Sequence, residues 1–408
     1  MDEADEALRA QYEAYPYPAR NPRDEGKRLA VGSPSHIREI DFWVFGAARS
    51  ASRPLRALFA GGGTGDGAIM LATQLVALGR PGHVTWLDRS RAARAIAEGR
   101  AAARKLENIT FVEGSLLDLP SSGLGPFDYV DCCGVLHHLP DPAAGLAALT
   151  SVLAEDGGIG LMVYAPHGRT GVYMVQDALR LLAPAEALPP SERVAVARRI
   201  LKHLPKTNWL RFNPNFTDLT LGGDAGVYDL LLNPRDRAFD VRAFFSLVEG
   251  EGLEVATLIE PARYDPALLL PDPKLRAAIE ALAPLDRAAL AEALAANMPT
   301  HIAYCVRAGA RVATPDPMAQ DAVPVARETP GSVFAEQLGP GNVLPMQFDA
   351  LTVGFPMPPF GAAILRRIDG VRTVGDMAAE LGEAFWRDWP AVWRVMSGIN
   401  RVLLRAPR

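Results

Sequence analysis

The chain has 408 residues, which is long enough for two or three domains, and 49% of them are hydrophobic, enough for sizeable cores. Its formal net charge of −5 provides no overall positive field to hold a phosphate backbone, so we expect no nucleic-acid partner. Its three cysteines make no disulfide framework and no Cys/His spacing resembles a zinc site, so we expect a reducing compartment and no bound metal.

The first 50 residues are expected to form a helical extension ahead of the main domain. The N-terminus is acidic without an apolar leader, and no run approaches 18 apolar residues, so we expect a cytoplasmic protein with no membrane partner. The pattern from Asp5 to Tyr12 predicts a short helix, and residues 15–18 (YPYP) must be extended because a residue before proline avoids the α region. Ser33 and Pro34 predict the start of a second helix.

A glycine-rich loop from Gly61 to Gly67 follows the apolar run 58–60 and precedes a helical pattern that begins at Ala68. Glycines between a strand and a helix let a ligand approach the backbone beside the positive end of the helix. Residues 63–68 satisfy the G-x-G-x-x-G/A dinucleotide pattern, and Asp88 follows the next apolar run, where a carboxylate can accept both ribose hydroxyls. The loop by itself predicts a nucleotide-like cofactor without identifying it.

The segment after the loop carries further motifs. A third buried strand at 109–114 (ITFVEG) leads into the segment that begins at Ser115. Residues 127–158 then read FDYVDCCGVLHHLPDPAAGLAALTSVLAEDGG, which contains an FDxV strand, an LHH-L-D turn, a helix and a Leu-x-x-x-Gly-Gly turn into a fifth strand. In the order and spacing of these motifs, residues 55–165 resemble the class I S-adenosylmethionine (SAM) methyltransferases. The resemblance favours SAM over a nicotinamide cofactor and implies S-adenosylhomocysteine as its product.

The resemblance also implies the fold. Short apolar strands alternate with helical patterns between 50 and 165, which is typical of a doubly wound parallel sheet. The runs at 253–259 and 301–307 match the family's sixth strand and its final antiparallel strand. We therefore expect an α/β protein with a seven-stranded, mostly parallel sheet, its SAM-binding domain in residues 51–165 and 250–310, and residues 1–50 over the cofactor cleft. The long crossover at 166–249 is expected to shape the acceptor site as a helical insertion.

The C-terminal part differs in composition. Residues 311–350 are rich in Pro, Gly and small polar residues and predict a linker. Residues 351–408 predict a compact α+β module, with Thr373 capping one of its helices. The order of its elements is weakly similar to the winged-helix modules of PqqD-like peptide-binding domains. A packing or dimerisation appendage without a ligand is the alternative.

The resemblance transfers a set of cofactor contacts to this chain. Gly61, Gly63 and Gly65 match the three family glycines, and Asp88 matches the ribose-binding acid. The implied SAM contacts are Tyr17, Gly61, Gly62, Gly63, Gly65, Asp66, Asp88, Arg89, Ser115, Leu116, Asp118, Cys132, Cys133 and Gly134. One position departs from the family: Phe59 stands where an acid often precedes the first glycine by two positions. The SAM ammonium would then be held from elsewhere, with Asp66 or the N-terminal segment as candidates.

Methyl transfer requires alignment of a nucleophile with the methyl carbon and, for a protonated acceptor, a nearby base. His137 and His138 are candidate bases, although this motif position is more often structural in the family. Tyr164, at the end of strand five, is expected to point toward the cleft. The crossover adds further polar candidates, of which we single out Tyr173; the full set is His167, Arg169, Tyr173, Gln176, Asp229, Asp236 and Arg237.

Three functions remain open at this point. The first is a methyltransferase that acts on a protein or peptide side chain, recognised partly by the C-terminal module. The second is a small-molecule N-, O- or C-methyltransferase, and the third is a SAM-binding protein without catalysis. The acceptor is unknown from the sequence, and the oligomeric state is open, with a homodimer among the options.

Overall fold

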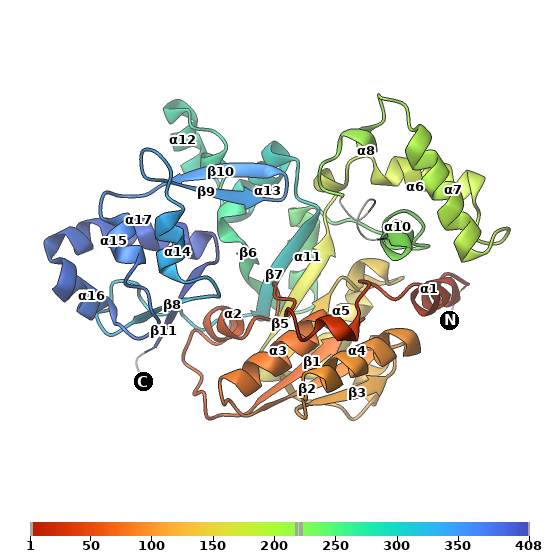
Figure 1. Ribbon diagram of the computed structural model, residues 1–408, viewed down its shortest axis with the longest axis horizontal. Coiled ribbons are helices and arrows are strands. Elements are labelled where there is room, and N and C mark those ends of the chain that lie inside the picture. The colour runs from red at the N-terminus through yellow and green to blue at the C-terminus, as the bar shows by residue number, and fades with distance from the viewer. Residues whose placement is uncertain (1–2, 217–218, 220–222, 407–408) are drawn as a thin grey trace.

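A computed structural model describes residues 3–216, 219 and 223–406 of the chain, and the statements below refer to these residues. A seven-stranded sheet lies at the centre of the molecule (Figure 1), with the strand order β3-β2-β1-β4-β5-β7-β6. Its strands are β1 (Leu55–Ala60), β2 (Gly82–Asp88), β3 (Ile109–Glu113), β4 (Phe127–Cys133), β5 (Leu153–Tyr164), β6 (Leu253–Ile259) and β7 (Thr300–Arg307). Neighbouring strands are parallel except β7, which runs antiparallel to both β5 and β6. The expected α/β fold is thereby confirmed.

Helices cover both faces of this sheet. One face packs against α2 (Ile37–Glu39), α3 (Asp66–Ala77) and α4 (Arg91–Ala103), and the other packs against α5 (Pro142–Ser151) and α11 (Val241–Gly250). Strands covered on both faces are buried along most of their length, which explains why β1 and β4 read as apolar runs without alternation. The strand order reverses between β1 and β4, and in such sheets a ligand crevice opens there at the carboxyl ends of the strands.

The N-terminal extension contains α1 (Glu3–Ala14), a 3-10 turn (Pro22–Asp24), α2 and a π-helical turn (Ile40–Val44). The helix expected to start at Ser33 begins only at Ile37. The delay has a local cause, because Ser35 adopts a φ of +88°, which is incompatible with a right-handed helix, and the ring of His36 caps the helix instead.

The crossover after β5 forms a helical lobe with a small apolar core of its own, on the right of Figure 1. Its helices are α6 (Val172–Leu182), α7 (Pro190–His203), α8 (Trp209–Phe212) and α10 (Gly223–Leu231). Helix α11 follows and already packs on the sheet. Two further helices, α12 (Pro273–Glu280) and α13 (Pro284–Ala295), lie between β6 and β7. None of the helices in the described residues has both the length and the apolar character needed to cross a membrane.

The prediction of a linker at 311–350 is wrong over most of that range. The segment contains β8 (Val323–Ala326), α14 (Gly331–Glu336) and β9 (Val343–Phe348). They combine with β10 (Leu351–Pro356), α15 (Gly361–Leu365), α16 (Val374–Leu381), α17 (Glu383–Gly398) and β11 (Val402–Arg405). Strand β8 pairs with β11 and β9 with β10, and one apolar core joins both halves. Residues 317–406 are called the C-terminal unit below; its similarity to PqqD-like modules stays a prediction.

One buried carboxylate is among the contacts that attach the C-terminal unit to the main domain, together with the ion pairs Arg263–Asp349 and Arg401–Glu260 and with Phe42, which packs in the core of the unit. Glu39 is 0% exposed and accepts hydrogen bonds from Ser33 and Tyr304 of the main domain. From the C-terminal unit, Arg327 forms an ion pair with it and the Asn400 amide donates to it at 2.8 Å. Because a buried carboxylate needs several donors to be stable, this contact helps to fix the position of the unit.

Candidate active site

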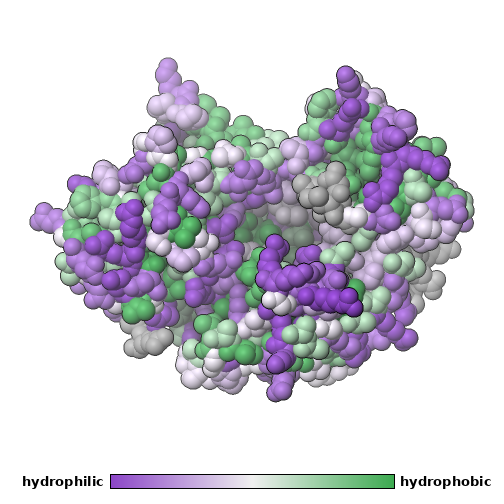
Figure 2. Space-filling model, in the orientation of Figure 1, coloured by the Kyte–Doolittle hydropathy of each residue, from purple (hydrophilic) through white to green (hydrophobic). Residues whose placement is uncertain are grey.

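A cavity of about 610 Å³ lies at the carboxyl ends of β1, β2, β4 and β5, where the strand order predicts a ligand crevice. The glycine loop and the residues that follow the strands form one part of its lining. Residues of the N-terminal extension between Arg9 and Pro34, and Asp229 of α10, form another part. The extension therefore lies over the cleft. Figure 2 shows that the molecular surface is hollowed between the C-terminal unit and the crossover lobe.

Because the loop glycines have no side chains, neighbouring side chains of the protein pack closely against the loop. A Cβ at Gly61, whose φ is +79°, would lie 2.4 Å from a methyl carbon of Val135, and one at Gly62 would lie 2.2 Å from the Trp86 ring. The Trp86 indole also donates a hydrogen bond to the Gly63 carbonyl at 3.1 Å. The loop is thus held tightly from below while its other side faces the cavity.

Asp88 at the end of β2 lines the cavity beside this loop. Its two carboxylate oxygens accept hydrogen bonds from the backbone N–H groups of Gly63 (2.8 Å) and Ser90 (2.9 Å). Burial raises the pKa of Asp88, and these backbone donors partly offset that rise. A carboxylate has about four lone-pair sites, so Asp88 keeps acceptor capacity for the hydroxyls of a ligand.

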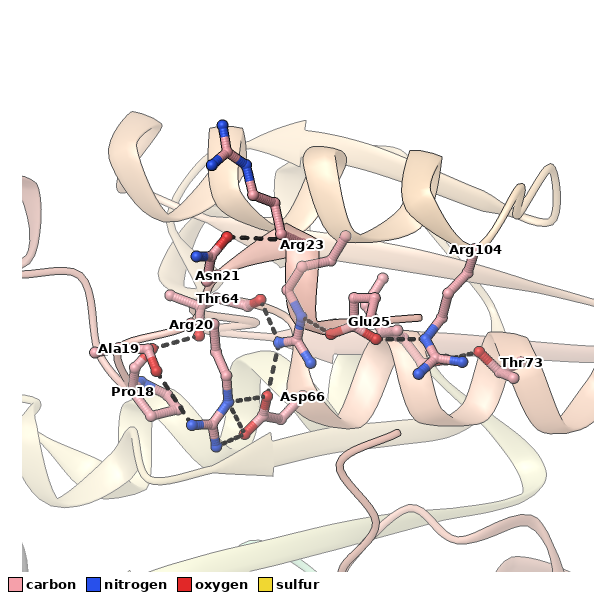
Figure 3. A network of polar contacts seen from close by, with 12 residues as sticks. Pro18, Ala19, Arg20, Asn21, Arg23, Glu25, Thr64, Asp66, Thr73 and Arg104 are labelled. Carbon is pink, nitrogen blue, oxygen red and sulfur yellow. Dashed lines mark hydrogen bonds and ion pairs between the residues drawn. The ribbon is translucent and has the colours of Figure 1, made fainter. Parts of the chain in front are cut away.

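Asp66 lines the same cavity, but its carboxylate is already paired. Arg20 of the N-terminal extension binds both oxygens, at 2.8 Å and 2.6 Å, and Arg100 of α4 binds one at 2.6 Å. Figure 3 shows Arg20 facing Asp66, with Glu25 bound to Arg104 farther along the network. Burial raises the pKa of Asp66, and the two arginines outweigh this effect and lower it. Asp66 therefore fastens the N-terminal extension to the helix that follows the loop.

The other predicted cofactor contacts divide into two groups. Lining the cavity are Tyr17, Arg89, Ser115, Leu116, Cys133 and Gly134. Outside its lining are Gly65, which packs against Ala97, the exposed Asp118, and Cys132. Cys132 faces the opposite side of β4 from Cys133, because successive strand residues alternate, and it is 0% exposed in the core there. Burial raises the pKa of both thiols, which does not favour a nucleophilic thiolate.

The two adjacent histidines have different environments. The His137 ring is 0% exposed, stacks on Tyr164 at 3.7 Å and accepts the Tyr164 backbone N–H at Nδ1, and burial holds its pKa well below the usual range. His138 lines the cavity, and its Nδ1 lies 2.6 Å from the Arg235 carbonyl. A carbonyl can only accept, so Nδ1 carries the proton and Nε2 presents a lone pair. Nε2 is buried and has no hydrogen-bond partner among the described residues.

Three segments distant in sequence meet beside His138. The hydroxyls of Tyr12 (α1) and Tyr164 (β5) donate to the two oxygens of Asp229 (α10), at 3.0 Å and 3.1 Å. Burial raises the pKa of Asp229 and of both tyrosines. Asp229 is 5% exposed, and it lines the cavity together with both tyrosines. We call Tyr12, His138, Tyr164 and Asp229 the polar end of the cavity.

Tyr173 lies outside the cavity lining, behind this group. Its hydroxyl accepts from Arg169 and donates to Asp236. Arg169 and Asp236 form an ion pair at 2.5 Å that is buried on both sides, and the Arg169 guanidinium lies 3.8 Å from the centre of the Tyr164 ring. Of the crossover residues singled out from the sequence, Asp229 alone lines the cavity, and Tyr173 contacts Arg169, whose guanidinium lies on the Tyr164 ring.

Asp131 in β4 also lines the cavity, and the sequence motifs did not single it out. It is 7% exposed, accepts the Ser35 hydroxyl at 2.5 Å, and pairs across the sheet with Phe59. Burial raises its pKa to about 7. The sequence did contain a sign of its importance, because Asp131 interrupts the apolar run between Val130 and Cys132. A strand that is covered on both faces rarely contains a carboxylate.

Comparisons with known proteins agree with this geometry. A family model described as a methyltransferase domain matches residues 58–159. An uncharacterized protein of Synechococcus sp. is 32% identical over 65% of this chain, and the chain spans 62% of that relative, less than two thirds of its length. A ubiquinone biosynthesis O-methyltransferase of Albidiferax ferrireducens is 26% identical over 43% of the chain and 71% of that protein.

Among solved structures, PKMT2 from Rickettsia typhi in complex with AdoHcy has a TM-score of 0.61 with 13% identity. The match covers 91% of this chain and 75% of that protein. At this identity the match shows a shared fold, and the fold extends beyond the segment that the family model covers.

Proposed function

Since the chain contains a methyltransferase domain with the class I fold, we propose that it is a SAM-dependent methyltransferase. The observation that carries the proposal is a single cavity with two chemically different ends. One end has a glycine loop beside the carboxylate of Asp88, which suits a nucleoside. The other is the polar end, where His138 has a free ring nitrogen.

The residues of the first end fit SAM. Asp88 keeps acceptor capacity for the ribose hydroxyls, and the loop presents backbone without side chains in between. Leu116 adds an apolar surface and Ser115 a polar one after β3, where the resemblance implies contact with the adenine. Tyr17 of the N-terminal extension would cover the cofactor from above.

SAM, when bound, supplies an electrophilic methyl group on a sulfonium. The protein's part is to orient the acceptor, exclude water and take up a proton. We assign orientation to Asp229 and the tyrosine hydroxyls that it holds. We assign proton uptake to Nε2 of His138, because its Nδ1 proton is fixed on the Arg235 carbonyl. His137 supports this group by stacking on Tyr164, and Tyr173 acts indirectly, because it accepts a hydrogen bond from Arg169, whose guanidinium lies on the Tyr164 ring.

The finer part of the proposal is that the acceptor is a protein or peptide side chain. The hollow in the surface between the C-terminal unit and the crossover lobe supports this, because a groove of this kind suits an extended polypeptide (Figure 2). A small molecule would require no such groove. The C-terminal unit would then border the path of the substrate.

Labelled SAM incubated with the protein and a cell lysate tests the proposal. Label in macromolecules supports a protein or peptide acceptor, and label in a small extractable product supports the small-molecule alternative. Binding of SAM without transfer to either would favour a SAM-binding protein without catalysis.

The cofactor site has its own test. Asp88→Ala removes charged hydrogen bonds to the ribose, so it should weaken S-adenosylhomocysteine binding by about 1.5–3 kcal/mol, measured by calorimetry. Ala replacement of exposed Asp118 should leave the affinity unchanged, because that side chain lies outside the cavity lining. Unchanged affinity in Asp88→Ala would contradict the cofactor assignment.

A further inference from the structure

Four carboxylates line the cavity, those of Asp66, Asp88, Asp131 and Asp229. They differ in what neutralises them. Asp66 is paired with two arginines, and Asp88 is bound by the loop backbone beside the proposed ribose site. Asp229 accepts from two tyrosines at the polar end. The fourth carboxylate, Asp131, has a neutral hydroxyl as its side-chain donor.

Asp131 has no cationic partner in the part of the chain that the structure describes. No Lys, Arg or His side chain of the described chain lies within ion-pair distance of it, and the Ser35 hydroxyl is its one side-chain donor. A buried carboxylate without a counter-charge is strongly unfavourable, and proteins keep such groups where a ligand supplies the charge. A cationic group of a ligand in the cavity would therefore stabilise the ionised form of Asp131.

The place of Asp131 identifies the part of the ligand that it faces. In the parallel pairing of β1 and β4, Asp131 lies opposite Phe59, so both side chains project from the same face of the sheet about 4.8 Å apart. Phe59 stands two residues before Gly61, the first glycine of the loop. Asp131 is thus beside the start of the loop, on the same side of the strand as Cys133, which also lines the cavity.

The local backbone supports a function for this contact. Ser35, which donates to Asp131, has a φ of +88°, a region that non-glycine residues rarely adopt. Its N–H donates to the Tyr304 hydroxyl at 2.8 Å, which holds the residue in place. Strained residues of this kind concentrate at ligand sites.

We propose that Asp131 binds the ammonium group of the cofactor's amino-acid moiety, in place of an acid on β1. This inference rests on the proposed function, because it takes SAM or S-adenosylhomocysteine as the ligand. Phe59 provides apolar contact where a carboxylate would otherwise stand, and the negative charge comes from the neighbouring strand. Asp66, one of the two candidate anchors considered from the sequence, stays paired with Arg20 and Arg100.

The test compares two ligands in calorimetry: S-adenosylhomocysteine and its analogue in which hydrogen replaces the α-amino group. The wild-type protein should bind the analogue about 10- to 100-fold more weakly, because the analogue cannot form the charged hydrogen bond. Asp131→Asn keeps the shape of the side chain and removes its charge. It should lose a similar factor for S-adenosylhomocysteine and bind both ligands equally.

Asp229→Asn is the matched control, because it removes a charge from the polar end of the same cavity. It should preserve the wild-type ratio between the two affinities. Equal binding of both ligands by the wild-type protein would overturn the inference, as would an unchanged ratio in Asp131→Asn with native circular dichroism. Absence of S-adenosylhomocysteine binding by the wild-type protein would instead overturn the proposed function, and this inference with it.

Discussion

Two neighbouring histidines of one turn have opposite relations to the cavity. His137 is enclosed and stacked under Tyr164, whereas His138 lines the cavity with Nε2 free. In both rings Nδ1 has a partner, the Arg235 carbonyl for His138 and the Tyr164 backbone N–H for His137, and in both Nε2 has none among the described residues. The difference is that only His138 lines the cavity. Adjacent positions in one motif thus support different functions.

We expect His138→Ala to lower kcat by about 10²–10⁴-fold, the usual contribution of a general base. The Kd for S-adenosylhomocysteine should stay within about twofold, since the base acts on the acceptor. Steady-state kinetics and calorimetry measure the two quantities. His203→Ala, on the exposed end of α7, serves as the control and should change neither. A His138→Ala enzyme with wild-type kcat would exclude the assignment.

Cofactor binding should depend on pH through Asp131. The groups that face this carboxylate come from its own strand and from the N-terminal extension: Tyr129, Cys133 and Ser35. Burial raises the pKa of Asp131 to about 7 in the free protein, so below pH 7 the group is mostly protonated and must ionise to bind an ammonium.

Affinity for S-adenosylhomocysteine should therefore rise with pH between about 6 and 7.5, by up to roughly tenfold per unit below the pKa. Calorimetry across this range measures the effect, and proton release on binding should accompany it. Asp131→Asn should show a flat profile over the same range. A wild-type profile without slope would contradict an ammonium contact at Asp131.

Motifs in the sequence were sufficient to locate the residues whose position depends on a single loop or strand end. Gly61, Asp88 and Cys133 belong to this class, and all three line the cavity. Asp229 was one of seven crossover candidates, and only the fold distinguishes it from the others, whereas Asp131 was not found from the sequence at all; each acts with partners more than 60 residues away in sequence. No local pattern encodes such a meeting of segments.

At the scale of elements, the N-terminal extension is held to α4 by a buried ion-pair network (Figure 3). Glu25 is 6% exposed and binds Arg100 at 2.5 Å, and it also pairs with Arg104. Arg100 is 1% exposed, so water can hardly reach its guanidinium to replace a lost carboxylate partner. The network positions the residues of the extension that cover the cavity.

Glu25→Ala should lower the free energy of unfolding by about 3 kcal/mol, because it removes a buried carboxylate that Arg100 and Arg104 share and leaves Arg100 with Asp66 as its remaining ion-pair partner among the described residues. Glu98→Ala removes an exposed i,i+4 pair with Arg94 and should cost less than about 0.5 kcal/mol. Urea denaturation compares the two variants. Similar midpoints for both would show that the network contributes little to stability.

Elements with a strong periodic pattern were predicted well, and those set by tertiary contacts were not. The seven strands of the sheet follow from apolar runs. The start of α2 was misplaced because the φ of Ser35 depends on Tyr304, which lies far along the chain. The segment 311–350 appeared to be a linker because short strands such as β8 are stable only when paired, here with β11.

At the scale of the whole molecule, Glu39 connects the C-terminal unit to the main domain. Glu39→Gln removes the charge that Arg327 pairs with in a buried setting, so unfolding should become easier by about 3 kcal/mol, measured in urea. Glu380→Gln, which weakens exposed pairs within the C-terminal unit, should have an effect below about 1 kcal/mol. Equal effects of the two substitutions would argue against a main role of Glu39 in attaching the C-terminal unit.

The hydrogen bonds of Glu39 continue toward the cavity. Tyr304 donates to Glu39 and accepts from the Ser35 backbone, and the Ser35 hydroxyl donates to Asp131. The C-terminal unit and the cavity thus share one set of buried contacts. In evolutionary terms the unit is therefore not an exchangeable module. A gene rearrangement that replaced it would need to supply new donors for Glu39; without them, the hydrogen bonds from Tyr304 and Ser35 to the cavity would also change.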